Sequence, residues 1–269
     1  MTDSFAAFRA LHHGDRPLLL PNAWDHASAA ALAARGHPAI GTTSLGVAAA
    51  AGLPDGAAAT RAETLHLARR LRGLPALLTV DVEAGFSDDP AEVAALAAEL
   101  AALGVVGINI EDGRPDGSLA PPALTAAAVA AVKDTTPEIF VNARTDAWWL
   151  GVADPLGQAL ERARLYRAAG ADGIFAPGVP DPDTIGILVA GLDAPLNVLH
   201  RPGGPTVAEL GRLGVARIST GSLLFRAALG AALAAADALR AADPAPGRAS
   251  PEPPSYVEVQ RLSAPPGAG

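Results

Sequence analysis

Cysteine is absent from this chain of 269 residues. Its absence excludes disulfide bonds, zinc sites built from thiolates, and cysteine nucleophiles. The sequence also contains no uninterrupted apolar run of about 18 residues or more, so a transmembrane helix is not expected. The N-terminal segment Met1–Phe5 has neither the basic start nor the apolar core of a secretory signal, and we therefore expect a cytoplasmic protein.

Basic residues are scarce as well. The chain has 20 Lys and Arg residues against 28 Asp and Glu residues, which gives a formal net charge of −8. A nucleic-acid surface needs clustered Lys and Arg to neutralise phosphates, and here the basic residues are scattered along helical segments. We therefore expect no nucleic-acid partner and no membrane partner, and we look for a site that binds a small molecule.

Short apolar segments alternate with helical stretches rich in Ala and Leu along the chain. Eight apolar segments are interpreted as strands: Leu18–Leu20, Ala39–Thr43, Ala76–Val82, Gly107–Glu111, Ile139–Ala143, Gly173–Ala176, Pro195–Leu199 and Ala216–Ser219. Eight stretches are interpreted as helices: Ala27–Arg35, Thr60–Leu71, Pro90–Leu103, Leu124–Lys133, Pro155–Ala169, Asp181–Ala190, Val207–Leu213 and Leu223–Arg240. Most of these helices begin with Asp, Thr or Pro, which favour the first positions of a helix.

This alternation predicts an α/β protein with a (β/α)8 TIM barrel. A doubly wound open sheet is the alternative, but it usually has a Gly-rich loop after its first strand, and this chain has Pro21–Asp25 there. We expect residues 1–242 to form a single barrel domain and residues 243–269 to form an extended arm rich in Pro and Ala. Within the arm, Ser255–Leu262 is expected to be a short docking element.

One predicted strand ends in two acids. In the segment 79–86, Thr-Val-Asp-Val-Glu-Ala-Gly-Phe, Asp81 and Glu83 are two residues apart and should therefore leave the same face of a strand. Burying two carboxylates together is costly unless a cation or hydrogen-bond donors compensate them. The segment therefore predicts that a compensating group lies opposite these oxygens.

Polar residues stand at the C-terminal ends of most of the predicted strands, where TIM barrels carry their active sites. They are Asn22, Asp25, Thr42, Thr43, Ser44, Asp81, Glu83, Glu111, Asp112, Asn142, Arg144, Asp146, Asn197, His200, Ser219 and Thr220. Acids from two neighbouring strands suit a hard divalent cation such as Mg²⁺, which takes oxygen ligands. Arg144 beside them suits a substrate carboxylate or phosphate.

Structural roles stay open for several of these residues. Asp112 and Asp146 are compatible with capping the loop or helix that follows each of them. Arg144 is compatible with a purely structural pairing to Glu111. His200 is compatible with a hydrogen-bonded histidine at the barrel rim.

Seven segments carry a more specific signal. They are residues 21–25 (Pro-Asn-Ala-Trp-Asp), 52–55 (Gly-Leu-Pro-Asp), 81–86 (Asp-Val-Glu-Ala-Gly-Phe), 107–112 (Gly-Ile-Asn-Ile-Glu-Asp), 143–147 (Ala-Arg-Thr-Asp-Ala), 195–198 (Pro-Leu-Asn-Val) and 214–221 (Gly-Val-Ala-Arg-Ile-Ser-Thr-Gly). Together, and in this order, they resemble the isocitrate lyase/phosphoenolpyruvate mutase superfamily. The resemblance is to its members similar to methylisocitrate lyase and carboxyphosphonoenolpyruvate phosphonomutase.

The resemblance implies a Mg²⁺-dependent barrel that acts on small 2-oxo or 2-hydroxy acids. It also implies a homotetramer, a dimer of dimers, in which a C-terminal helix crosses to a neighbour. The residues that it assigns to the metal, one directly and the others through water, are Asp81, Glu83 and Glu111. The residues that it assigns to the substrate are Ser44, Leu45, Gly46, Arg144 and Asn197, and Asp55 falls in a loop that reaches the site.

The chain departs from the superfamily where its lyases keep their acid. Their loop after the fourth strand carries Lys-[Lys/Arg]-Cys-Gly-His, whose Cys protonates the departing carbanion. Here Glu111 and Asp112 are followed by Gly-Arg-Pro-Asp-Gly-Ser-Leu-Ala-Pro-Pro, with neither the Cys nor the Lys. Glu83 also replaces a commoner Asp.

These observations favour a Mg²⁺-dependent C–C lyase that cleaves a small 2-oxo or 2-hydroxy di- or tricarboxylic acid through a metal-stabilised enolate. Isocitrate-like cleavage and oxaloacetate decarboxylation both fit this class. Arg144, His200 and Asp55 are the candidate catalytic residues, with His200, Asp55 and a metal-bound water as acid or base. A mutase of the phosphoenolpyruvate type, an oxaloacetate-type hydrolase, and a barrel that binds 2-oxo acids without turnover are the alternatives.

Overall fold

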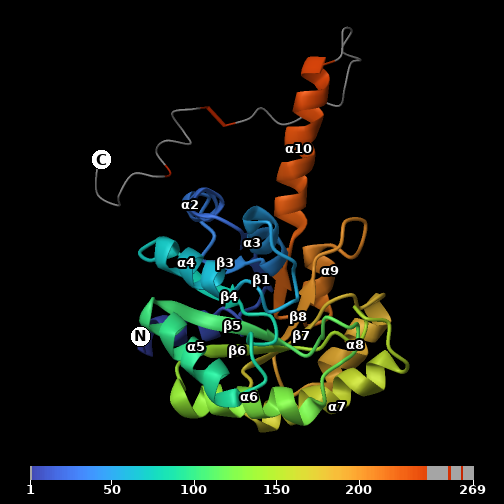
Figure 1. Cartoon of the computed structure of the whole chain (residues 1–269). Helices are drawn as coiled ribbons and strands as arrows, with labels where there is room; N and C mark the ends of the chain where they lie inside the picture. Colours follow the sequence, from blue (N-terminus) through green and yellow to red (C-terminus); the bar gives the residue numbers. More distant parts are fainter. Residues whose placement is uncertain (1, 241–253, 256–261, 263–269) are drawn as a thin grey trace.

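The structure is a computed structural model that describes residues 2–240, 254, 255 and 262. Its centre is a sheet of parallel strand segments wound into a nearly closed barrel (Figure 1). The segments are β1 (Leu18–Leu20), β2 (Asn22–Ala23), β3 (Ala39–Thr42), β4 (Leu77–Asp81), β5 (Val105–Glu111), β6 (Phe140–Arg144), β7 (Gly173–Ala176), β8 (Leu196–Leu199) and β9 (Arg217–Ser219). The (β/α)8-type barrel predicted from the sequence is confirmed.

The barrel closes because β1 and β2 are two parts of one strand. They are interrupted at Pro21, which has no N–H to donate to a strand ladder. β1 pairs with β9, with Leu19 opposite Ile218, and β2 pairs with β3. The order β1-β9-β8-β7-β6-β5-β4-β3-β2 therefore returns to the strand where it began.

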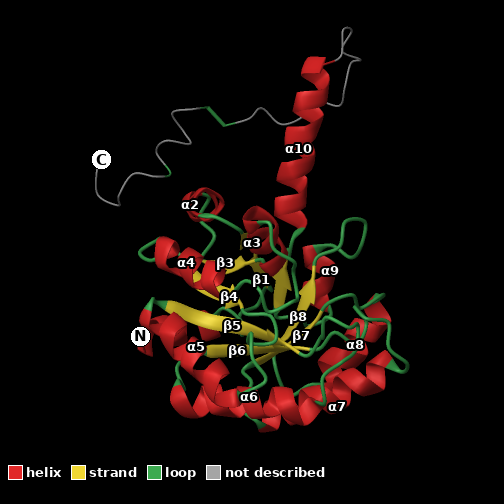
Figure 2. Cartoon of the chain, viewed as in Figure 1, coloured by secondary structure: helices red, strands yellow, loops and turns green. Residues whose placement is uncertain are grey.

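Helices accompany the strands, and most of them pack around the outside of the barrel (Figure 2). They are α1 (Thr2–Ala10), α2 (His26–Ala34), α3 (Ser44–Ala51), α4 (Arg61–Leu71), α5 (Pro90–Ala102), α6 (Pro122–Thr135), α7 (Pro155–Ala168), α8 (Pro182–Gly191), α9 (Val207–Arg212) and α10 (Leu223–Arg240). The eight predicted helices are confirmed with small differences at their ends, whereas α1 and α3 were not predicted. Each departs from the strand–helix alternation, since α1 precedes the first strand and α3 lies in the connection that leads to α4.

The N-terminal end of the barrel is closed by α1 and the loop after it. Phe8 is fully buried and packs edge-on against Phe140 at the start of β6, with ring centroids 5.4 Å apart. His12 stacks on the same Phe140 ring at 4.3 Å, and its Nδ1 lies 2.9 Å from the carbonyl oxygen of Phe8. This plug leaves the opposite end of the barrel as the open one.

The helix α10 has a different environment from the others. It projects away from the barrel (Figure 1), and none of its residues is buried. Leu229, Leu233 and Leu239 are among its exposed apolar side chains. In the part of the chain that the structure describes, no helix is long and apolar enough to cross a membrane. The predicted arm at 243–269 and its docking element lie almost wholly outside the described residues.

Candidate active site

A cavity of about 330 Å³ opens at the C-terminal ends of the strands, where the sequence placed the site. Of the residues predicted to be catalytic, to bind substrate or to bind the metal, those that line it are Ser44, Leu45, Asp55, Asp81, Glu111 and Arg144. Gly46, Glu83, Asn197 and His200 were also predicted and are not among the lining residues. The structure therefore brings together most of the predicted metal and substrate residues in one cavity.

Two carboxylates face this cavity from the neighbouring strands β4 and β5. Burial raises the pKa of Asp81 to about 6, and Arg144 opposes the rise while Asp55 adds to it. Burial also raises the pKa of Glu111 well above its usual value, with Arg144 again opposing and Asp81 adding to the rise. The two acids thus carry an electrostatic cost that a further positive charge would offset.

Arg144 at the end of β6 is held between two acids. Its Nη1 lies 2.7 Å from Glu111 Oε2, and its Nε donates to Asp146 Oδ1, also at 2.7 Å. Burial tends to lower the pKa of Arg144, but Glu111, Asp146 and Asp81 together raise it above its ordinary value, so the group stays protonated. Its guanidinium also lies over the Phe175 ring, 5.6 Å from the centroid. A charge fixed in this way can bind a substrate anion without much loss of side-chain entropy.

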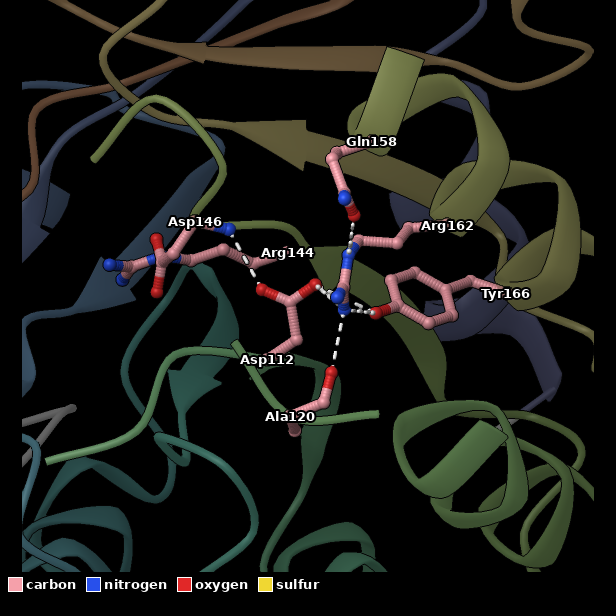
Figure 3. Close-up of polar contacts among 7 residues, drawn as sticks. All are labelled: Asp112, Ala120, Arg144, Asp146, Gln158, Arg162 and Tyr166. Atoms are coloured by element: carbon pink, nitrogen blue, oxygen red, sulfur yellow. Dashed lines mark hydrogen bonds and ion pairs between the residues drawn. The ribbon is translucent and has the colours of Figure 1, made fainter. Parts of the chain in front are cut away.

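Asp146 is in turn positioned by a buried network around Asp112 (Figure 3). Asp112 is fully buried, and its Oδ1 accepts a hydrogen bond from the backbone N–H of Asp146 at 2.8 Å. Its Oδ2 accepts from Tyr166 Oη at 2.7 Å and from Arg162 Nη1 at 3.1 Å. Burial and the Asp112 charge raise the pKa of Tyr166 above its usual value, so it remains a donor. Asp112 is therefore an internal anchor that ties α7 to the segment bearing Arg144.

Glu83 does not lie as predicted. β4 ends at Asp81, and Glu83 has a φ of 51°, so the two acids do not leave one face of a strand. The Glu83 carboxylate is buried and accepts from Ala58 N at 2.9 Å and from Thr60 Oγ1 at 2.7 Å. These bonds hold the connection between α3 and α4 against the end of β4. A metal-binding role for Glu83 stays a prediction.

The first turn of α3 supplies donors at the cavity wall. Ser44 and Leu45 begin this helix, and Thr43 before them makes no side-chain cap. The first N–H groups of a helix have no partner within it and favour anions. Gly46 lies behind them, where an added Cβ would come within 2.8 Å of the Trp24 side chain. Gly46 therefore allows close packing and does not contact the cavity.

The remaining predicted residues lie at different depths. Asp55 reaches the cavity from the connection after α3. Asn197 is buried in the barrel interior, where its Oδ1 accepts from Ser219 Oγ at 3.1 Å. His200 is half-buried, and its backbone N–H donates to the carbonyl oxygen of Ser219 at 2.8 Å. Asp55 is thus the predicted acid or base that borders the cavity.

Three polar residues of the cavity wall were missed by sequence reasoning, namely Asn109, Arg114 and Ser222. Arg114 lies in the loop after β5, and its Nη1 contacts Asp88 Oδ1 at 2.6 Å. Asn109 lies on β5, two residues before Glu111, and therefore on the same strand face. The two-residue spacing from Glu111 is the sequence signal that would have indicated Asn109.

The donor set fits a magnesium ion. Buried carboxylate oxygens that face an open cavity are hard ligands whose burial cost a divalent cation would offset. Among the described residues, no group of three or more His, Asp or Glu side chains is arranged to hold an ion by itself. Mg²⁺ does not need such a group, because it usually keeps several waters and takes only one or two carboxylates from the protein. Asp81 and Glu111 are the pair that suits it.

Sequence comparison places this geometry among known proteins. Residues 8–240 match the phosphoenolpyruvate phosphomutase family. The chain is 45% identical over 254 residues to an uncharacterised protein of Mycobacterium tuberculosis strain H37Rv, which covers 94% of this chain and 95% of that protein. It is 33% identical over 208 residues to a probable 2-methylisocitrate lyase 2 of Corynebacterium glutamicum, which covers 72% of this chain and 66% of that protein.

Solved structures of similar proteins have the same fold. A putative lyase/mutase from Burkholderia cenocepacia has a TM-score of 0.86 and 33% identity, covering 98% of this chain and 97% of that one. A phosphonopyruvate hydrolase solved with oxalate and Mg²⁺ has a TM-score of 0.81, 23% identity and coverage of 96% and 94%, and shares the fold. The chain belongs to the phosphoenolpyruvate phosphomutase family, within the superfamily of isocitrate lyase and phosphoenolpyruvate mutase that its seven segments resemble.

Proposed function

We propose that this protein is a Mg²⁺-dependent C–C lyase that acts on a small 2-oxo or 2-hydroxy di- or tricarboxylic acid. The observation that carries the proposal is the arrangement of Asp81 and Glu111 around one cavity with Arg144, whose fork is held by Asp146. This arrangement offers oxygen ligands for a divalent cation beside a fixed donor for a carboxylate. Relatives named 2-methylisocitrate lyase support the same class of reaction.

Asp81 and Glu111 would hold the ion. When bound, Mg²⁺ would supply Lewis-acid stabilisation of the negative charge that develops on a substrate oxygen as the C–C bond breaks. Arg144 would orient the substrate carboxylate through its planar fork. The first N–H groups of α3, at Ser44 and Leu45, would bind the other carboxylate oxygen and keep the reacting bond aligned.

Asp55 is the proposed proton-transfer residue of the chain. It borders the cavity, whereas His200 is not among the lining residues. A general acid or base must come within hydrogen-bond reach of the reacting atom, directly or through one water. The order of the sequence-based candidates is therefore reversed in this proposal, with Asp55 first and His200 second.

Turnover with a panel of acids tests the proposal. Isocitrate, 2-methylisocitrate, oxaloacetate and phosphonopyruvate would be assayed with Mg²⁺ and with chelator, with products identified by NMR. We expect Mg²⁺-dependent cleavage of a C–C bond without addition of water, and Asp81→Asn to lower kcat/KM by about 100-fold or more. Asp134→Asn, which changes an exposed acid of α6, is the matched control and should retain activity.

Other products would redirect the proposal. Cleavage or rearrangement of the C–P bond of phosphonopyruvate would make the protein a phosphonopyruvate hydrolase or a mutase, and release of acetate with oxalate from oxaloacetate would make it a hydrolase. Tight binding of several acids without turnover would indicate a binding protein and not a lyase. Full activity in Asp81→Asn, or in chelator, would refute a metal role for this cavity.

We also propose that the protein is a homotetramer in which α10 packs against a neighbouring subunit. The support is the exposed apolar side of this helix, where Leu229 is 50% and Leu233 is 59% exposed. Apolar patches of this kind mark protein interfaces. Light scattering should give about four times the mass of the chain, and the double variant Leu229→Glu and Leu233→Glu should give smaller species. A monomeric wild type would refute the proposal.

A further inference from the structure

A layer of polar side chains fills the barrel interior beneath the cavity. Asn109 of β5 reaches the cavity, although only 4% of its surface is exposed. Asn142 of β6 and Arg217 of β9 lie beside it and are buried. Among the described residues, no carboxylate lies within ion-pair distance of Arg217. A charged group enclosed in this way is costly to bury, so its hydrogen bonds constrain their acceptors strongly.

These donors fix the orientation of the Asn109 side chain. Its Oδ1 lies 3.0 Å from Asn142 Nδ2 and 3.2 Å from Arg217 Nη2. A guanidinium has donors only, so the atom that faces Arg217 must be the amide oxygen and cannot be the amide nitrogen. Burial lowers the pKa of Arg217 to about 9, with Asp81 opposing, so Arg217 stays protonated at neutral pH.

The amide nitrogen of Asn109, Nδ2, must therefore point away from Arg217. Asn109 Nδ2 donates no hydrogen bond within the described part of the chain. The atom is also not fully buried. It therefore touches the cavity. In the strand register Asn109 stands beside Asp81, and Glu111 follows two residues later on the same face. A fixed N–H donor is thus placed among the acids proposed to hold the metal.

We propose that Asn109 is a substrate-binding residue whose Nδ2 donates to an oxygen of the bound oxyacid, and that Arg217 and Asn142 are its positioning residues. The inference rests on the proposed function, because it requires an oxyacid in this cavity. The ligand atom is a carboxylate or enolate oxygen, since these accept hydrogen bonds and carry the negative charge that the site is built to receive. The donor costs no reorganisation when the ligand binds, because the amide is already turned.

Calorimetric titration with oxalate in the presence of Mg²⁺ tests the inference, with oxalate as a planar probe for an oxyacid. Asn109→Ala removes the donor and should weaken oxalate binding about 10- to 150-fold. Asn109→Asp keeps the shape but turns an oxygen toward the ligand, and should weaken binding at least as much. Asn109→Asp also gives Arg217 a carboxylate partner, so the melting temperature of this variant should not fall below that of the wild type. Thr79→Val, which removes a buried hydroxyl without a partner in the described residues, is the matched control and should bind oxalate normally.

The outcomes separate this inference from the proposed function. If the wild type does not bind oxalate in the presence of Mg²⁺, both the proposed function and this inference are refuted. If the wild type binds and Asn109→Asp binds within threefold of it, the inference alone is refuted. A crystal of the wild type with Mg²⁺ and oxalate gives a direct check should a variant fold poorly. Nδ2 at hydrogen-bond distance from oxalate supports the inference, and Nδ2 beyond about 4 Å overturns it.

Discussion

Replacing Arg162 with Met should destabilise the protein and loosen the site together. Arg162 lies on α7 and is 6% exposed, and its Nη1 donates to Asp112 Oδ2 at 3.1 Å and to the carbonyl oxygen of Ala120 at 2.8 Å. Met fills a similar volume but donates nothing. The Asp112 carboxylate, which is fully buried, would then keep Tyr166 and the Asp146 backbone as donors but lose its only cation within ion-pair distance among the described residues.

The magnitude follows from this loss. Removing one partner of a buried ion pair costs about 3–5 kcal/mol, because the other charge is left enclosed. Urea denaturation should therefore show a free energy of unfolding lower by that amount, with an unchanged slope. Arg164→Met is the matched control, since Arg164 is exposed on the same helix and its replacement should change stability by no more than about 0.5 kcal/mol.

The same variant tests whether Asp112 positions the site. Because Asp112 holds the N–H of Asp146, and Asp146 holds Arg144 Nε, oxalate affinity should also fall at a temperature where the variant is folded. An unfolding free energy within about 1 kcal/mol of wild type would refute the energetic argument. A large loss of stability with unchanged affinity would show that the anchor supports the fold but does not position Arg144.

Two further predictions follow from buried charges. Burial lowers the pKa of His12 to about 3 from 6.5, with Arg217 adding to the shift, so the unfolded chain binds the extra proton between these values. The contribution of His12 to the free energy of unfolding is therefore complete above about pH 6.5. It falls by at most about 5 kcal/mol as the pH drops toward 3. His12→Phe keeps a ring on Phe140 and should lack this part of the pH dependence. Arg144→Lys keeps the charge but cannot reach both Glu111 and Asp146 with a planar fork, so we expect oxalate to bind about 10-fold more weakly or worse by calorimetry. Superimposable stability–pH curves for His12→Phe and wild type, or normal affinity in Arg144→Lys, would contradict the respective argument.

The fold was predictable because its signals are local and repeated. Each strand is a short apolar run, most helices begin with Asp, Thr or Pro, and the alternation of the two leaves few topologies. Pro21 shows the limit of this reasoning, since it splits the first strand into β1 and β2 without breaking the barrel. The helices α1 and α3 were not predicted because neither occupies a place in the strand–helix alternation.

The site was predictable only where a residue's role follows from its place on a strand. Asp81, Glu111 and Arg144 end neighbouring strands, so their meeting in one cavity follows from the topology. The roles of Glu83 and Asn109 depend instead on partners far away in the sequence. Thr60 takes up one Glu83 oxygen across 23 residues, and Arg217 turns the Asn109 amide across 108. No periodicity or motif records such a bond, because a carboxylate with its partner and one without are the same letter in the sequence. The distinction between a side chain that serves the fold and one that is left facing a ligand therefore appears only when every donor and acceptor around it is counted.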